Sequence, residues 1–326
     1  MARLMSGVLA IIVGVGGIVV LFWALNKLVE VLPPRWEHRL KPYVFVGPAI
    51  ATVTVMLVWP AVRTAYLSFF DARSVNFVGF ENYALLATDP ALRSALLNNL
   101  LWIIVVPAMS VAVGLLVAVL ADRLKPTMEK VTKSVIFMPM AISFVGASTI
   151  WGFIYVWRPE GQNQIGLLNA IWTAFGGDPQ TWLQISTLRL NSLLLMIILV
   201  WLQAGFAMVL LSAAIKNVPE DTLEAARIDG ATEIQIFFRV VVPQIASTIM
   251  VVFTTIVILV LKVFDVVFVM TGGRFDTDLV AVRFIRELFT FREFGRAAAI
   301  VVVLMLATIP VMVYNIKQFR KQEATG

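Results

Sequence analysis

Few side chains in this 326-residue sequence could bind a polar molecule, and those that could lie inside apolar runs. Gln203 lies between Trp201 and Gly205, where its amide could hydrogen-bond hydroxyl groups while the indole ring stacks on apolar C–H faces. Lys262 and Asp265 lie three residues apart in another run, a spacing that places side chains on one helix face. Because polar groups are costly in lipid, they usually face the protein interior or a cavity. We therefore predict that the glutamine, tryptophan, lysine and aspartate line a substrate pathway.

Each of these polar residues also has a purely structural interpretation. Gln203 can form a hydrogen bond between two helices, and Lys262 and Asp265 can form an ion pair that contacts no substrate. Either arrangement would satisfy the polar groups inside lipid. Three weaker candidates for the pathway, for which helix capping or packing is a sufficient explanation, are Asn98, Asn99 and Ser143.

The sequence carries no recognisable catalytic constellation. It has no Gly-x-x-x-x-Gly-Lys-Ser/Thr phosphate-binding loop, so we do not expect the chain to hydrolyse ATP by itself. It has no cysteine, and its single histidine, His38, lies in a charged segment, so thiolate chemistry is excluded and a metal site is not expected. No basic run is interleaved with aromatic residues, which argues against a nucleic-acid partner. We therefore predict neither enzymatic activity nor a cofactor.

The composition predicts that these residues are positioned by membrane helices. Hydrophobic residues make up 60% of the chain and charged residues 14%, against roughly 45–50% and about 25% in soluble domains. A helix needs about 20 apolar residues to cross a bilayer. The sequence therefore predicts an all-α, polytopic membrane protein. The seven predicted spans are residues 7–31, 43–67, 95–121, 135–157, 191–214, 245–270 and 297–316.

The distribution of basic residues indicates the orientation of these spans only weakly. With the N-terminus outside, the cytoplasmic loops, among them 33–42 and 122–133, hold thirteen Lys and Arg residues and the external loops hold ten. Five of those ten are arginines between residues 274 and 296, which argue against the assignment. Segment 158–189 is predicted to be an external loop with a short interfacial helix.

One polar stretch, residues 216–243, separates two of the apolar runs. Pro219 can occupy the first turn of a helix, where its missing N–H is not needed. Gly230 allows a sharp turn, and Thr232 can cap a second helix. Pro243 then marks a break before the next span. The pattern predicts a helix, a glycine turn and a second helix at the membrane surface, a shape that another protein could bind.

This stretch resembles the EAA loop of permease subunits of binding-protein-dependent ABC importers. The resemblance implies a coupling helix that docks in a cleft of a separate ATPase subunit. It further implies that Glu224 makes a polar or ionic contact there, while Ala225, Ala226 and Gly230 supply the close fit. The matching positions are Glu224, Ala225, Ala226, Gly230 and Pro243, with Val240 and Val242 in place of the usual isoleucine and leucine.

Further matches resemble the carbohydrate branch of this family. They are the FMPMAIS run at 137–143, the Gly-Leu-Leu-Asn run at 166–169, the Phe-Asp pair at 264–265 and the Met-Thr-Gly-Gly run at 270–273. The resemblance covers residues 43–321, and the overall run is most similar to permeases for alpha-glucosides such as maltose, sucrose or trehalose. It implies an ATP-driven sugar importer in which this chain forms the translocation pathway.

The resemblance also implies a domain organisation and a set of partners. Residues 43–321 would form a six-helix type I importer permease core with the coupling loop at 216–243. Residues 1–42 would add an N-terminal membrane helix and a cytoplasmic loop, and 322–326 would be a tail. The expected partners are a second homologous permease, two ATP-binding cassette subunits, an extracytoplasmic solute-binding protein, the sugar and membrane lipid. The expected location is the bacterial inner membrane, crossed several times.

An alternative function belongs to a different class. An ion- or proton-coupled secondary transporter acting alone could use Lys262, Asp265 and Arg63 as coupling charges. That interpretation leaves the spacing of the EAA match unexplained, and the chain shows no obvious inverted repeat. A membrane scaffold without transport activity is a third possibility, which predicts no uptake defect on deletion.

Overall fold

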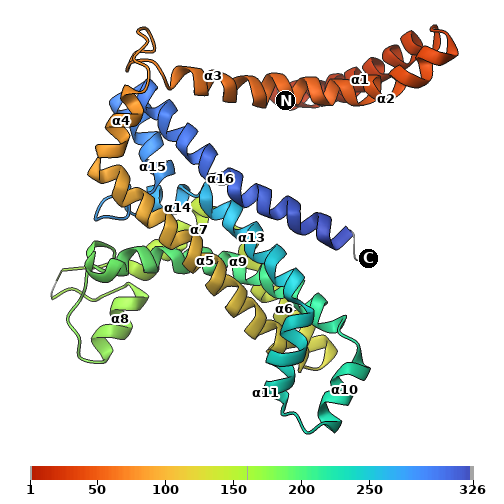
Figure 1. The fold of residues 1–326 in the computed structure, drawn as a ribbon. Helices are drawn as coiled ribbons and strands as arrows, with labels where there is room; N and C mark the ends of the chain where they lie inside the picture. The colour runs from red at the N-terminus through yellow and green to blue at the C-terminus, as the bar shows by residue number, and fades with distance from the viewer. Residues whose placement is uncertain (1, 160, 324–326) are drawn as a thin grey trace. The chain divides into compact units, whose positions relative to one another are not determined.

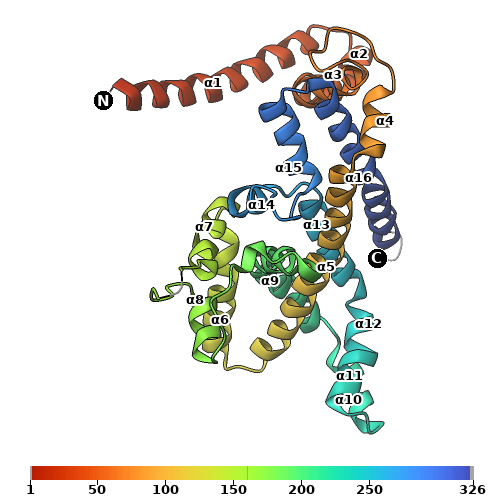
Figure 2. The ribbon, with the colours of Figure 1, turned by 90° about the vertical axis from the view of Figure 1, so that its left-hand side faces the viewer.

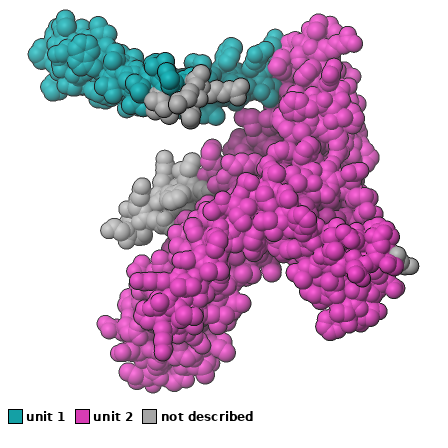
Figure 3. Space-filling model, turned by 180° about the vertical axis from the view of Figure 1, so that it is seen from behind, with its two compact units in different colours: residues 1–66 teal, residues 67–326 magenta. Residues whose placement is uncertain are grey.

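The computed structural model describes residues 2–159 and 161–323 as helices joined by loops (Figure 1). In this described part the β structure is limited to one isolated bridge between Phe70 and Phe77. The prediction of an all-α, polytopic membrane protein is confirmed. By their internal contacts the residues fall into two units, Met1–Tyr66 and Leu67–Gly326, which are described separately (Figure 3). The predicted domain boundary after residue 42 remains a prediction.

The first unit consists of two long helical segments. Helix α1 (Ala2–Glu30) is followed by one continuous segment of α2 (Pro34–Val53), the π-helical turn η1 (Thr54–Val58) and α3 (Trp59–Leu67). The predicted loop at 33–42 is therefore wrong in length, because α2 already begins at Pro34. A proline at the first helical position loses no intrahelical hydrogen bond, so it favours this early start.

The second unit contains the remaining elements, which run from the loop after α3 to the C-terminal helix. In chain order they are α4 (Glu81–Thr88), α5 (Pro90–Asp122), α6 (Pro126–Phe137), η2 (Met138–Ala141), α7 (Phe144–Tyr155), α8 (Leu167–Ala174), η3 (Trp182–Gln184), η4 (Thr187–Arg189), α9 (Leu190–Lys216), α10 (Glu220–Ile228), α11 (Glu233–Ile236), η5 (Phe237–Val241), α12 (Val242–Gln244), α13 (Ala246–Leu261), α14 (Asp265–Met270), α15 (Val280–Ile285), η6 (Arg286–Phe291) and α16 (Phe294–Glu323).

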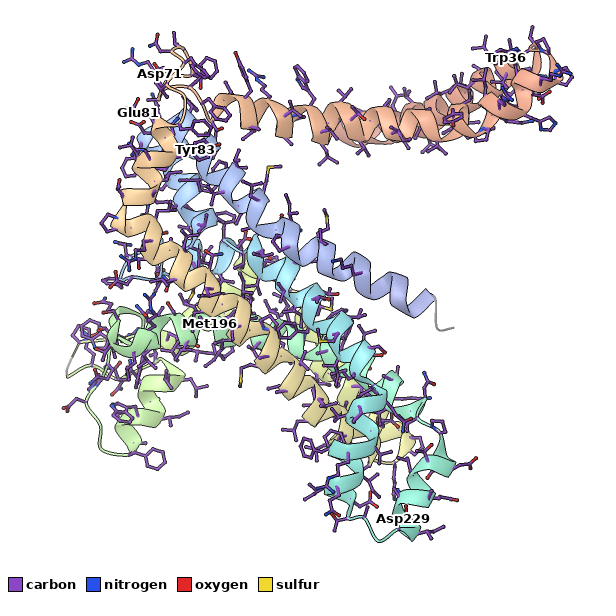
Figure 4. The ribbon with its side chains drawn as sticks, viewed as in Figure 1. Trp36, Asp71, Glu81, Tyr83, Met196 and Asp229 are labelled. Atoms are coloured by element: carbon purple, nitrogen blue, oxygen red, sulfur yellow. The ribbon has the colours of Figure 1, made fainter. Side chains whose placement is uncertain are left out.

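Helices α5 and α9 form the centre of this unit and run in the same direction. Met196, in the first third of α9, is buried in the main core cluster (Figure 4). A Cβ atom on Gly114 of α5 would lie 2.6 Å from Cβ of Ala207 and 2.8 Å from the backbone N of Met208. Glycine is therefore needed at this crossing, because any larger residue would push the two backbones apart.

The membrane spans differ from the predicted ones mainly in being bent. By length and composition α5 and the segment Thr187–Lys216 can each cross a membrane as one rod. Pro126–Ala141 and Phe144–Tyr155 meet at 104°, and Glu233–Gln244 and Ala246–Leu261 meet at 70°, so each pair forms either one broken span or a re-entrant loop. The prediction of a single span over 245–270 is corrected, because α13 ends at Leu261 and α14 begins only at Asp265.

The last predicted span corresponds to the first part of α16, whose apolar portion, Phe294–Pro310, is shorter than the other spans. With the two spans of the first unit, the described residues thus account for each of the predicted apolar runs. The described residues contain four helices that are long and apolar enough to cross a membrane, or up to six if each bent pair is one span, so the number of about seven crossings remains a prediction.

The second unit has two opposite ends. The ends of α5 and α9 and the start of α6 meet at one end, from which the α10–α11 hairpin projects with Asp229 at its tip (Figures 2 and 4). The starts of α5, α15 and α16 meet at the other end, close to Asp71 and Glu81 (Figure 4). The predicted coupling loop and two of the predicted external segments, 69–93 and 274–296, therefore lie at opposite ends of the unit.

Candidate functional site

The predicted coupling loop is a helical hairpin with a glycine at its turn. Helix α10 ends in a Schellman motif, in which the N–H of Gly230 donates to the carbonyl of Arg227 at 3.0 Å and the N–H of Ala231 donates to that of Ala226 at 3.1 Å. Gly230 has a φ of 80°, a left-handed conformation that costs other residues energy. Thr232 then caps α11 through a capping box with Gln235.

The four residues of the coupling motif do not share one environment. Glu224, Ala225 and Gly230 are exposed, whereas Ala226 is half-buried and packs against the apolar cluster at the base of the hairpin. The carboxylate of Glu224 has no ion pair or hydrogen bond with any described residue, so it is available to a partner. Ala226 therefore supports the hairpin from within, while the other three residues form part of its outer surface.

The hairpin is held closed by a basic residue and ends in an apolar tip. Arg227 pairs with Glu233 at 3.0 Å and with Glu220 at 3.4 Å, and the hydrogen bond that Arg227 donates to Glu233 raises the pKa of the arginine. Ile228 and Ile234 flank the turn with 86% and 72% of their surface exposed. Sequence reasoning missed these two residues, which lie on either side of the glycine turn in an otherwise polar stretch.

A network of charges lies at the base of the hairpin and joins three helices. The ammonium group of Lys133 on α6 lies 2.5 Å from Asp122 of α5 and 2.6 Å from Glu129, and it also contacts the hydroxyl of Ser212 on α9. Lys216, the last residue of α9, donates to the same Glu129 carboxylate. These five residues, named here the base network, connect the segment that leads into α10 to the start of the bent helix pair formed by α6 and α7.

A cavity of about 500 Å³ borders an earlier part of α9 and contains three of the predicted pathway residues. Ser143, Gln203 and Asp265 come from the start of α7, the middle of α9 and the start of α14. Thr255 of α13 adds a hydroxyl group that sequence reasoning missed. The other lining residues are apolar: Met140, Ile142, Phe144, Val145, Leu202, Phe206 and Leu259. This space is named here the central cavity.

The backbone explains how each polar group reaches the central cavity. Ser143 lies at the 104° bend and caps α7 by accepting a hydrogen bond from the N–H of Gly146 at 3.1 Å, as its capping interpretation predicted. Gln203 is 6% exposed, and its amide has no hydrogen-bond partner among the described residues, so the predicted interhelical bond is not formed. A buried amide without a protein partner that faces a cavity is available to a ligand.

The predicted ion pair between Lys262 and Asp265 is wrong. The helix breaks between the two residues, so they do not share a helix face, and no ion pair joins them in the described structure. Lys262 is exposed and does not line the central cavity, whereas Asp265 begins α14 and does.

The remaining candidates lie outside the central cavity. Trp201 packs edge to face against Trp151, with ring centroids 5.9 Å apart. Asn99 accepts a hydrogen bond from the N–H of Val280 at 2.8 Å, and Asn98 donates to the carbonyls of two loop residues near Val280. These contacts agree with the packing interpretation of the two asparagines.

Comparisons with known proteins agree with this geometry. Residues 90–320 match the family model described as "Binding-protein-dependent transport system inner membrane component". The osmoprotective compounds uptake permease protein GgtC of Synechocystis sp. is 52% identical over 279 residues, which cover 86% of this chain and 99% of the relative. The alpha-glucoside transport system permease protein AglF of Rhizobium meliloti is 44% identical over 336 residues, which cover 99% of each chain.

A solved structure shares the fold. A bacterial ABC transporter involved in the import of the acidic polysaccharide alginate superposes with a TM-score of 0.74 at 20% identity, covering 88% of this chain and 99% of that chain. The family match supports an importer permease over the alternative of a secondary transporter that acts alone. The chain therefore belongs to the family of inner membrane components of binding-protein-dependent transport systems.

Proposed function

We propose that this permease forms the translocation pathway for an alpha-glucoside or a similar small oligosaccharide. The central cavity is the observation that carries the proposal, because it places a hydroxyl, an amide and a carboxylate around one space inside the membrane spans. Its volume of about 500 Å³ lies within the range of about 300–1,000 Å³ that small-ligand sites occupy. The 44% identity to a permease named for alpha-glucosides supports the same class of cargo.

The side chains of the central cavity suit a carbohydrate. Gln203 can donate and accept hydrogen bonds, and Asp265 can accept them from sugar hydroxyls. Phe144 and Phe206 can pack against the apolar faces of a sugar ring. Discrimination between sugars and other molecules would come from the buried amide of Gln203, because a cargo that cannot hydrogen-bond to this amide leaves it unsatisfied.

Energy would enter through the hairpin. The exposed surface of Glu224, Ala225 and Gly230, with the apolar tip beside it, would dock in a cleft of a separate ATPase subunit. Movement of the hairpin would reach α6 through the base network, and α6 leads directly to the bend that carries Ser143. Two ATPase subunits, a second permease and an extracytoplasmic solute-binding protein would complete the importer in the inner membrane, and ATP would be hydrolysed in the ATPase subunits.

Uptake by cells that lack this chain tests the proposal. Radiolabelled maltose, sucrose and trehalose are supplied to the deletion strain and to strains that carry wild-type, Gln203→Leu or Lys262→Gln chains. We expect Gln203→Leu to lower uptake of the transported sugar about tenfold, since two hydrogen bonds are lost. Lys262→Gln is the matched control and should retain uptake, because it lies outside the cavity. Unchanged uptake of all three sugars in the deletion strain would contradict the proposal.

A further inference from the structure

Two smaller cavities continue from the central cavity along α7 and α14, which pack against each other (Figures 1 and 2). The first measures about 310 Å³ and begins one helical turn beyond the central cavity, at Ser148 of α7 and Val269 of α14. The second measures about 340 Å³ and shares Tyr155, Leu183 and Met270 with the first. The three cavities therefore follow one another along α7 and α14.

The second of these cavities has a mixed lining. Trp157 is 41% exposed and presents an aromatic face, and Gln184 is exposed with an amide that bonds to no described residue. Arg274 lines the same space; its Nε donates to the carbonyl of Thr271 at 3.2 Å, and no described carboxylate pairs with its guanidinium group. An aromatic ring, a free amide and a guanidinium group can together bind the faces and hydroxyl groups of a sugar.

One buried asparagine fixes the wall of this cavity. Asn169 is fully buried and accepts hydrogen bonds from the indole N–H of Trp182 and from the N–H of Gln180, both at 2.9 Å. Its amide group donates to the carbonyls of Gln180 at 3.0 Å and Val156 at 3.2 Å. All four hydrogen bonds of the side chain are thus used to hold the wall, so the cavity is preformed rather than created by a ligand.

We propose that this outer cavity is a second carbohydrate-binding subsite, which holds the sugar before it enters the central cavity. The proposal rests on the proposed function, since it assumes that the cargo is a sugar. Trp157 would stack on one sugar ring, while Gln184 and Arg274 would hydrogen-bond its hydroxyl groups. The series of cavities along α7 and α14 would then be the route from this subsite to Gln203.

The chain has no cysteine, so single introduced cysteines report on the subsite directly. Full importers that carry Gln184→Cys or Phe175→Cys are treated from outside with a membrane-impermeant maleimide. Maltotriose is present in one sample, and glycine betaine at the same osmolarity is present in the comparison sample. Phe175 is the matched control, because it is 88% exposed in the same outer segment but does not line the cavity. We expect maltotriose to slow labelling of the Gln184→Cys chain severalfold and to leave the Phe175→Cys chain unchanged.

A second variant tests the stacking contact. Adding Trp157→Ala to Gln184→Cys should raise about fivefold the maltotriose concentration that gives half protection from labelling. Adding Trp157→Tyr instead should keep this concentration close to that of the Gln184→Cys chain alone. Equal labelling with and without maltotriose, in an importer that still takes up maltotriose, would overturn the subsite and leave the proposed function standing. Absence of any alpha-glucoside uptake by the wild-type importer would instead overturn the proposed function.

Discussion

Replacing Gly230 by alanine isolates the backbone conformation at the turn of the hairpin. Glycine has a φ of 80° here, and a Cβ atom at this position would meet nothing within 4 Å. Alanine therefore introduces no clash, and its effect comes from the left-handed conformation alone. That conformation costs a residue with a side chain about 1–2 kcal/mol.

A relaxed turn would not have a lower free energy cost than this strain. If the turn relaxed, the hairpin would lose the bonds that Gly230 and Ala231 donate to the end of α10, each of which contributes about 0.5–1.5 kcal/mol. A penalty of 1–2 kcal/mol lowers the population of the native turn about five- to thirtyfold relative to relaxed forms. We therefore expect Gly230→Ala to weaken ATPase binding and sugar uptake whenever the native turn is no longer strongly favoured.

The assay compares Gly230→Ala with Gly230→Asn in the same importer. Asparagine adopts the left-handed conformation more readily than alanine, so it should retain more activity despite its larger side chain. Co-purification of the ATPase subunit and initial rates of uptake are measured at equal levels of permease in the membrane. If alanine were as active as glycine, or if asparagine were more damaging than alanine, the conformational explanation would be refuted.

Three further substitutions test separate parts of the molecule. Asp265→Asn should lower sugar uptake about tenfold or more while the ATPase subunit stays bound, since a charged acceptor is lost from the central cavity; unchanged uptake would remove Asp265 from the pathway. Lys133→Met should preserve ATP hydrolysis but reduce the sugar moved per ATP, because the base network loses its shared cation; an equal loss of both activities would indicate a purely structural role. Ala226→Asp should prevent stable binding of the ATPase while the chain still inserts in the membrane, because a carboxylate would face the apolar base of the hairpin; a normal complex would place Ala226 outside that packing.

The hairpin is the part of the fold that local sequence signals predict best. Pro219 precedes α10, Gly230 supplies the turn and Thr232 caps α11, as the residue types indicate. Each of these signals acts within a few residues of its own position, so no tertiary contact is needed to interpret it. Their functional roles toward a partner remain predictions.

The break between α13 and α14 could not be predicted from the sequence. The three residues from Lys262 to Phe264 contain no glycine or proline, and two of them are apolar. Helix α14 instead turns to pack against α7, so the break depends on tertiary contacts. For the same reason the sequence could nominate Ser143, Gln203 and Asp265 separately but could not show that they surround one cavity.

Arg283 and Arg286, two of the arginines near the C-terminal span, also have a structural explanation. Arg283 lies 2.9 Å from Asp89 and 3.0 Å from Glu287, and Arg286 lies 3.0 Å from Asp278. Basic residues that pair within the protein form part of its packing, which explains why counting them gives a weak indication of orientation. The carboxylates that neutralise them come from as far away as residue 89, beyond the reach of a local charge pattern.

The central claim is that the hairpin faces the cytoplasm and transmits the motion of an ATPase subunit. A Glu224→Cys variant of this cysteine-free chain tests it most directly, with a membrane-impermeant maleimide and a short thiol-to-amine cross-linker applied to vesicles of both orientations. The account predicts labelling only in inside-out vesicles and a cross-link to the ATPase subunit whose yield changes when ATP is added. Labelling from the outside, or a hairpin that never cross-links to an ATPase bound in the same complex, would contradict it.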